Sequence, residues 1–389
     1  MPAHRFHDVA IAAGYNTEQS RVLEGHDSDS IAIEAARGAL AAAGLEPSDV
    51  DGLGGRHHEA VAKALGVEPA WSTPGFTAVT TLLDACNAIA AGECETAVLA
   101  WGGAGLYTER AATAPWTRPN NQFTAPFGMF TAVEFALMAR RHMIMHGTKP
   151  EQLATVAATI RNNGHVNPGA VYYGRGPFAP DDILTSRMVA DPFHLLDCAM
   201  TAEGGAALVV TTATRAQDLR LKPVYLLGGD RDYLGQTYDQ VPAWDYTVPE
   251  LEGEPAGYVG RLAARRAFTT GGVTHDDISV CEFYDPFSFE IIRQFEAFEF
   301  CGPGEGGDFV MGGTIEPGGR YPVTTDGGTM SFGHGGGIVQ LLQRVIRGVE
   351  QIQGVCATNQ VPDAEVALCT CGGAGALFTD VVVLGVEQP

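Results

Sequence analysis

The chain has 389 residues, of which 45% are hydrophobic and 18% charged, a composition typical of a globular protein with a large buried core. Its net charge of −22, from 24 basic and 46 acidic side chains, argues against binding to nucleic acid backbones. Eight cysteines without CxxC pairs, and no apolar run of membrane-spanning length, predict a reduced cytoplasmic protein without a metal site.

The first informative segment is one that occurs twice. Residues 35–50 read AARGALAAAGLEPSDV, and residues 263–278 read AARRAFTTGGVTHDDI. Each segment predicts an amphipathic helix that ends at a glycine, Gly44 or Gly272, followed by a short turn into a strand. The two copies therefore indicate similar supersecondary units in the two parts of the chain.

A second repeated pattern follows in the same order. Residues 97–105 and 366–375 are short apolar runs that both end in Gly-Gly-Ala-Gly, as expected for a buried strand that ends in a tight turn. A helical stretch precedes each run, at 77–91 and 337–353. We therefore predict two similar α/β halves, residues 1–215 and 216–389.

The first half carries an insertion, residues 106–195, that has no counterpart in the second half. It contains a predicted helix, Thr131 to His146, between loops rich in aromatic residues, proline and glycine. Long insertions in compact domains commonly serve as lids or binding loops. We expect this one to cover a substrate, with Phe127 and Met129 among the contacts.

Three glycine-rich segments, read together with the duplication, resemble the thiolase superfamily. They are SRMVADPFHLLDCAMTAEGGAALVVTT (186–212), FCGPGEGGDFV (300–310) and PVTTDGGTMSFGHGGG (322–337). The nearest resemblance is to the sterol-carrier-protein-x type, also called non-specific lipid-transfer proteins. It covers essentially the whole chain and implies a thiolase fold, with a five-layered αβαβα core and the insertion as a loop domain.

The position of the thiolase nucleophile departs from that resemblance. Thiolases place a cysteine at the start of a helix, where the partial positive charge of the helix terminus lowers the thiol pKa. Here the corresponding position falls on or near Gly75, in the sequence TPGFT. Cys86 lies about ten residues further on, and we expect it to be a core residue. An acyl-enzyme is therefore not expected.

Two further positions bear on the reaction. In the segment CEFYDPF (281–287), Tyr284 and Pro286 stand where sterol-carrier-protein-x thiolases carry a histidine and a cysteine. A Tyr-Asp pair at this place is similar to the steroid side-chain-cleaving acyl-CoA aldolases. His334, in GHGGG, keeps the thiolase histidine where those aldolases carry tyrosine. We predict Tyr284 and His334 as acid/base groups, with Asp285 as a structural hydrogen-bond acceptor.

Three more residues are candidates for the site. Tyr246, before Pro-Glu-Leu, resembles a catalytic aldolase tyrosine, although packing at the rim of the cleft is an equal alternative. Gly335 and Gly75 would let backbone and CoA thioester approach closely. Cys371 stands near the place of a thiolase proton-shuttling cysteine and is assigned to the substrate-binding set, while core packing of Cys369 and Cys371 is the alternative.

The predicted function is retro-aldol cleavage of a β-hydroxyacyl-CoA, which needs a base, an oxyanion hole and an acid but no nucleophile. The CoA thioester is then a substrate, and no covalently bound cofactor is expected. The alternatives are a thiolase-type acyltransferase and a non-catalytic subunit of a CoA-enzyme complex. The resemblance also implies a homodimer and a small OB-fold and zinc-ribbon partner, which together make a heterotetramer.

Overall fold

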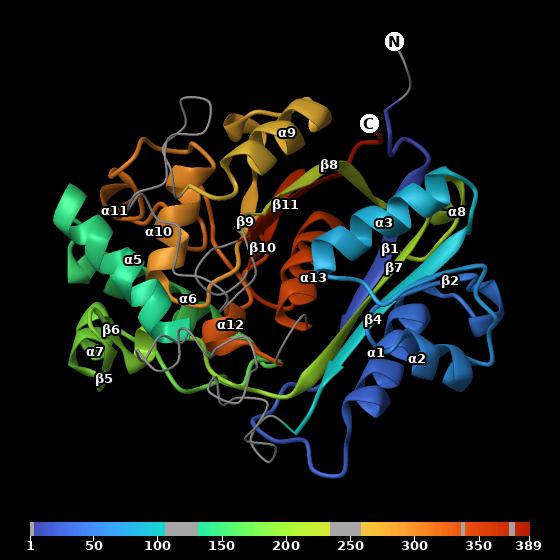
Figure 1. Ribbon diagram of the computed structural model, residues 1–389, viewed down its shortest axis with the longest axis horizontal. Helices are drawn as coiled ribbons and strands as arrows, with labels where there is room; N and C mark the ends of the chain where they lie inside the picture. Colours follow the sequence, from blue (N-terminus) through green and yellow to red (C-terminus); the bar gives the residue numbers. More distant parts are fainter. Residues whose placement is uncertain (1–3, 106–130, 234–257, 336–338, 373–377) are drawn as a thin grey trace.

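The structure is a computed structural model that describes residues 4–105, 131–233, 258–335, 339–372 and 378–389 (Figure 1). Tyr246, Phe127 and Met129 lie outside these ranges. The elements of the first half flank the insertion and form one half-sheet with its helices. They are β1 (Val9–Asn16), α1 (Ser28–Ala43), η1 (Pro47–Asp49), β2 (Gly52–Gly54), α2 (His58–Leu65), β3 (Trp71–Thr73), α3 (Ala78–Ala90), β4 (Thr96–Gly103), β7 (Gly204–Thr212) and α8 (Ala213–Gln217).

The insertion is mainly helical in its described part. Its elements are α5 (Thr131–His146), α6 (Pro150–Val166), α7 (Pro180–Thr185), β5 (Met188–Ala190), β6 (Phe193–His194) and η5 (Leu195–Asp197). The helix predicted from Thr131 to His146 is confirmed as α5. Pro150 begins α6 at the first helical position, where its missing N–H costs no hydrogen bond.

The second half repeats the order of the first. It contains β8 (Val224–Tyr233), α9 (Arg261–Gly271), η6 (His275–Asp277), β9 (Val280–Glu282), α10 (Ser288–Ala297), α11 (Gly306–Phe309), α12 (Gly328–Ser331), α13 (Val339–Gln353), β10 (Val366–Gly372) and β11 (Phe378–Gly385). Helices α1 and α9 both end before a left-handed glycine, Gly44 at φ 76° and Gly272 at φ 63°, and a 3-10 turn follows each. The predicted helix stops are confirmed.

The strand order shows the same duplication. The sheet runs β3-β2-β4-β7-β1-β8-β11-β10-β9, so that β2-β4-β7-β1 matches β9-β10-β11-β8 read from the other edge. In each of these two sets of four strands, one parallel pair is followed by two antiparallel pairs, and β3 adds a further parallel pair at the edge of the first half. Strands β1 and β8 join the halves through only two residue pairs, Ala10↔Tyr225 and Ile11↔Val224. The boundary between residues 215 and 216 remains a prediction.

The hydrophobic clusters separate the layers of the fold. One cluster packs α1 against β1, β4 and β7, and another packs α9 and α10 against β8, β10 and β11. The third contains α3 and α13 together with strands of both halves. Figure 1 shows α3 and α13 between the two half-sheets, with α1 and α9 on the outer faces. This is the predicted five-layered αβαβα arrangement.

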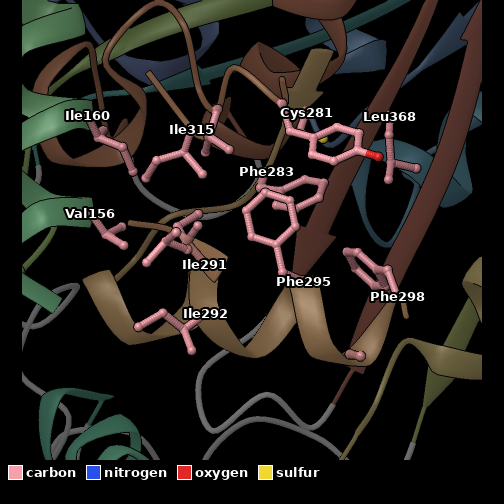
Figure 2. Close-up of a cluster of buried hydrophobic side chains, with 14 of the residues drawn as sticks. Val156, Ile160, Cys281, Phe283, Ile291, Ile292, Phe295, Phe298, Ile315 and Leu368 are labelled. Atoms are coloured by element: carbon pink, nitrogen blue, oxygen red, sulfur yellow. The ribbon is translucent and has the colours of Figure 1, made fainter. Parts of the chain in front are cut away.

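The insertion is anchored to the second half by an apolar core. Figure 2 shows Val156 and Ile160 of α6 in the same cluster as Ile291 and Phe295 of α10 and Phe283, which follows β9. Residues 131–195 are thus part of the packed body of the protein. The prediction that the insertion covers a substrate also concerns residues 106–130 and stays a prediction. No helix among the described residues has the length and apolarity to cross a membrane.

Candidate active site

The glycine-rich ends of the strands bring distant segments together. A methyl group at Gly103, the last residue of β4, would overlap the carbonyl oxygen of Gly335. One at Gly372, the last residue of β10, would lie 3.0 Å from the ring of Tyr284. The glycines of the repeated Gly-Gly-Ala-Gly pattern therefore give the segments of both predicted acid/base residues room to pack against the strand ends.

Tyr284 lies just after β9 and is held through its backbone. Its N–H donates to Thr370 Oγ1 at 2.9 Å, and its carbonyl accepts from Gln294 Nε2 at 2.7 Å. The side chain is 7% exposed. Because both main-chain groups are bonded to buried side chains, the phenol projects from a fixed point beside Gly372.

Asp285 has the structural role predicted for it. Its carboxylate accepts hydrogen bonds from the N–H groups of Thr329, at 2.8 Å, and Met330, at 3.1 Å. Burial raises the pKa of Asp285 to about 7. The residue therefore joins the Tyr284 segment to α12, the short helix that precedes His334.

His334 is held in one tautomer. Its Nδ1 lies 2.7 Å from the carbonyl oxygen of Met200, and since a carbonyl only accepts, Nδ1 carries the proton. Burial lowers the pKa of the imidazole, which favours the neutral ring with a free electron pair on Nε2. Because Nδ1 holds the proton of the neutral ring, Nε2 can donate a hydrogen bond only in the imidazolium. The neutral ring is instead placed to act as a base.

Gly75 stands just before α3 and has no room for a side chain. Its φ is 68°, in the left-handed region, and an added methyl group would overlap Thr81 Oγ1. Thr77 caps α3 by accepting from the N–H of Thr80. The start of this helix therefore has no cysteine, and position 75 has no space for one.

All eight cysteines lie among the described residues and are reduced. Burial raises the pKa of every one of them, so no thiolate is favoured. Cys86 is fully buried, as predicted. Cys371 is 1% exposed, and its Sγ points to the carbonyl of Leu341. This placement fits the core alternative for Cys371 rather than a substrate contact.

Two sets of buried polar residues near the site were not predicted from the sequence. Asp380, on β11, accepts from Thr77 Oγ1 and lies 3.3 Å from Arg231 Nε, and burial raises its pKa to about 6. Arg344 binds both oxygens of Asp326 at 2.7 Å and lies 3.5 Å from Glu282. Burial raises the pKa of Glu282 to about 7. The available signal was the polar face of α13, where Gln340, Arg344, Arg347 and Gln351 recur at helical spacing.

No cluster of three or more potential metal ligands occurs in the described part of the chain. Tyr284 lies beside the end of β10, Gly335, the neighbour of His334, lies beside the end of β4, and Gly75 lies just before α3. Thr77 links that helix to Asp380, which pairs with Cys371 in the β10–β11 ladder. The described residues of this region offer a base and a phenol, and no cysteine stands at the start of α3.

Comparison with known proteins gives consistent matches. A family described as thiolase C-terminal domain-like matches residues 256–386. Over 88% of this chain and 90% of the relative, the chain is 34% identical to the 17-hydroxy-3-oxo-4-pregnene-20-carboxyl-CoA lyase of Mycobacterium tuberculosis. Over 94% of this chain and 97% of the relative, it is 32% identical to the steroid side-chain-cleaving aldolase of Thermomonospora curvata.

Solved structures agree with these matches. The chain superposes on a chain of the Ltp2-ChsH2(DUF35) aldolase with a TM-score of 0.82 and 31% identity, covering 97% of this chain and 98% of the other. Human mitochondrial 3-ketoacyl-CoA thiolase matches with a TM-score of 0.68 and 14% identity, over 98% of this chain and 99% of the other. The second match shows only the fold.

Proposed function

Because the chain belongs to the thiolase superfamily, in the group of the steroid side-chain-cleaving aldolases, we propose that it cleaves a carbon–carbon bond of a β-hydroxyacyl-CoA. It is a carbon–carbon lyase of the retro-aldol type. The substrate class is a CoA thioester with a hydroxyl on the β-carbon of a bulky, steroid-derived side chain. The products are a ketone and a short acyl-CoA.

The observation that carries this proposal is that no cysteine stands at the start of α3. Thiolase chemistry needs a thiolate there, whereas this chain has Gly75 with the side-chain space filled by Thr81. Retro-aldol cleavage forms no acyl-enzyme and so needs no residue at that place. Raised pKa values at all eight cysteines agree with a mechanism that uses no thiolate.

We assign the proton transfers from the chemistry of the two side chains. His334 Nε2 takes the proton of the β-hydroxyl, and the resulting alkoxide collapses to the ketone as the bond between the α- and β-carbons breaks. The electron pair of that bond passes to the thioester as an enolate. The Tyr284 phenol then protonates the α-carbon. The imidazolium returns its proton to the tyrosinate, and the site is restored.

The remaining candidates would bind the thioester. Gly335 and Gly75 offer backbone without side chains, where a pantetheine arm can approach closely. Phe127 and Met129 would contact the apolar part of the substrate, and Tyr246 would be a further hydrogen-bond donor. The CoA thioester is the substrate, and we propose no resident cofactor.

We also propose an assembly. The Ltp2-ChsH2(DUF35) structure is an aldolase with a second component, which supports a small OB-fold and zinc-ribbon partner for this chain. Two copies of the chain pairing about a two-fold axis, each with one partner, would make a heterotetramer. Since CoA thioesters are intracellular metabolites, the cytoplasm is the proposed compartment.

The test is product analysis by mass spectrometry, with and without a co-expressed OB-fold partner. We expect a steroid 17-hydroxy-20-carboxyl-CoA thioester to give a 17-ketosteroid and propionyl-CoA without consumption of free CoA. The analogue that lacks the 17-hydroxyl is the control and should be inert. CoA-dependent cleavage of a β-ketoacyl-CoA, with an acyl adduct on the protein, would instead establish the acyltransferase. Activity that survives changing both Tyr284 and His334 would indicate a non-catalytic subunit.

A further inference from the structure

Arg161, in the insertion helix α6, is 1% exposed and has no carboxylate among its hydrogen-bond partners in the described residues. Its guanidinium donates to three main-chain carbonyls instead. Nε donates to Leu196 at 2.6 Å, Nη2 to Cys198 at 2.8 Å and Nη1 to Met330 at 2.9 Å. Burial lowers the pKa of Arg161, and Tyr172, whose ring centre lies 4.9 Å from the guanidinium carbon, and the nearby Asp197 offset this only in part. The cost of burying this guanidinium indicates that its three hydrogen bonds serve a function.

The carbonyls belong to two segments that meet at His334. Residues 196–202, which we call the strap, run past the candidate site and end at β7. The strap residue Met200 accepts the Nδ1–H of His334, and the N–H of Ala202 donates to the His334 carbonyl at 3.2 Å. Met330, four residues before His334, belongs to α12. Arg161 therefore binds both the segment that accepts the imidazole proton and the segment that carries the imidazole.

The strap also reaches the other catalytic segment. The N–H of Ala199 donates to the carbonyl of Pro286 at 2.8 Å, and the N–H of Met200 donates to Thr329 at 3.2 Å. Movement of residues 196–202 would thus alter the surroundings of Tyr284 and His334 together. Asn163, two residues beyond Arg161 on α6, donates to the carbonyls of Val323 and Thr324. It therefore supports the segment that leads into α12.

We propose that Arg161 is a positioning residue for the lyase, which clamps the strap to α12 so that the Met200 carbonyl keeps His334 in the Nδ1–H tautomer. The inference rests on the proposed role of His334 as the base. The planar guanidinium suits this task because its donors diverge at fixed angles, and lysine cannot reproduce that geometry. Arg161 itself does not touch the reacting atoms, and its effect passes through the imidazole.

The experiment combines ¹⁵N NMR of the histidine side chains with steady-state kinetics on the full chain with its partner. The variants are Arg161→Gln and the milder Arg161→Lys, which keeps the cation and still reaches one carbonyl if the first variant fails to fold. Arg293→Lys is the matched control, because Arg293 is also fully buried but bonds Glu290 and the Val259 carbonyl. His334→Gln identifies the His334 signals.

In the wild type we expect a protonated Nδ1 and an unprotonated Nε2 at His334. In Arg161→Gln we expect a mixture of tautomers and a loss in kcat of about 100-fold, with KM changed by less than about 3-fold and Arg161→Lys intermediate. Arg293→Lys should leave the tautomer unchanged. An unchanged His334 spectrum in both Arg161 variants would overturn the inference. Absence of lyase activity in the wild type would overturn the proposed function instead, while the NMR comparison would still decide the role of Arg161.

Discussion

At the scale of single residues, the hydrogen bond from His334 Nδ1 to Met200 decides which form of the imidazole is chemically useful. The neutral ring has its electron pair on Nε2, and burial lowers its pKa below the ordinary value of 6.5. The base is therefore in its active form at neutral pH. Protonation removes it, and the lowered pKa moves that loss to more acidic solution.

The first prediction follows from the lowered pKa of His334. We expect kcat to stay constant from about pH 8 down to about 6.5 and to fall only below that value, because His334 must be neutral to accept a proton. His334→Gln should lower kcat by about 100-fold or more and remove this acidic limb. A pH–rate profile of kcat in the complex checks it. An acidic limb that persists in His334→Gln would assign the base elsewhere.

Tyr284 carries the second prediction. Tyr284→Phe removes one hydroxyl while keeping the ring against Gly372 and both backbone hydrogen bonds. We expect kcat to fall by about 100- to 10,000-fold, as for loss of a general acid, in a variant that still folds. Steady-state kinetics and thermal unfolding test this together. Wild-type turnover in Tyr284→Phe would exclude the phenol as the acid.

At the scale of elements, α3 is a capped and well-packed helix that has no cysteine at its start. The helix has its cap, Thr77, and its buried face, but the residue before Phe76 is a glycine in the left-handed region. Thr81 fills the space that a side chain at Gly75 would need. Restoring a cysteine there would therefore strain the turn before it could supply a thiolate.

The third prediction compares Gly75→Ala with Gly66→Ala. Both glycines have similar φ, 68° and 71°, but an added methyl group at Gly66 meets nothing within 4 Å. Gly66→Ala should cost only the backbone strain, about 1 kcal/mol of unfolding free energy, whereas Gly75→Ala should cost about 1 to 3 kcal/mol more from overpacking. Urea unfolding measures both. Equal costs would mean that Thr81 moves aside freely.

Two arginines of α13 support the turn that precedes α12. Arg344 and Arg347 lie one turn apart on a buried helix and hold the turn at Thr325 and Asp326, which leads into α12. Because Asp285 accepts from the first N–H groups of α12, the helix α13, the turn and the Tyr284 segment form one hydrogen-bonded unit. The short helix before His334 is therefore supported from both the insertion and the central layer.

At the scale of the whole molecule, several carboxyl groups are buried where ionisation is costly. The pKa values of Glu282 and Asp285 are raised to about 7 and that of Asp380 to about 6, from unfolded values near 4. Between about pH 4 and about pH 7 these carboxyl groups therefore bind more protons in the native state than in the unfolded state. Stability therefore falls as the pH rises through this window, by about 1.4 kcal/mol per pH unit for each such group.

The fourth prediction is that thermal stability is greater near pH 5.5 than near pH 8. The neutral His334 opposes this trend only below about pH 6.5, where the unfolded state takes up a proton that the folded state resists. Asp380→Asn keeps an acceptor for Thr77 and removes one titrating group, so its melting temperature should vary less with pH. Calorimetry across this range checks both. A melting temperature that increases steadily to pH 8 would contradict the assignment.

The sequence by itself determined the repeated architecture and the missing nucleophile. Glycine stops, amphipathic periods and the Gly-Gly-Ala-Gly strand ends are local signals, and α9, α13, β10 and the bounds of α5 followed from them. The resemblance of residues 281–287 and 322–337 to the thiolase superfamily placed Tyr284 and His334 in the candidate site. Cys371, assigned to substrate from the same resemblance, lies in the core instead.

Only the tertiary structure decided how those residues can act. The carbonyl that sets the His334 tautomer lies 134 positions away in the chain, and the carbonyls that bind Arg161 come from two separate segments. The pKa of Asp380 depends on its burial, on the hydrogen bond from Thr77 and on Arg231 of another strand. Hydrogen-bond partners and the loss of solvent are created by contacts between distant residues, so no local pattern in the sequence encodes them.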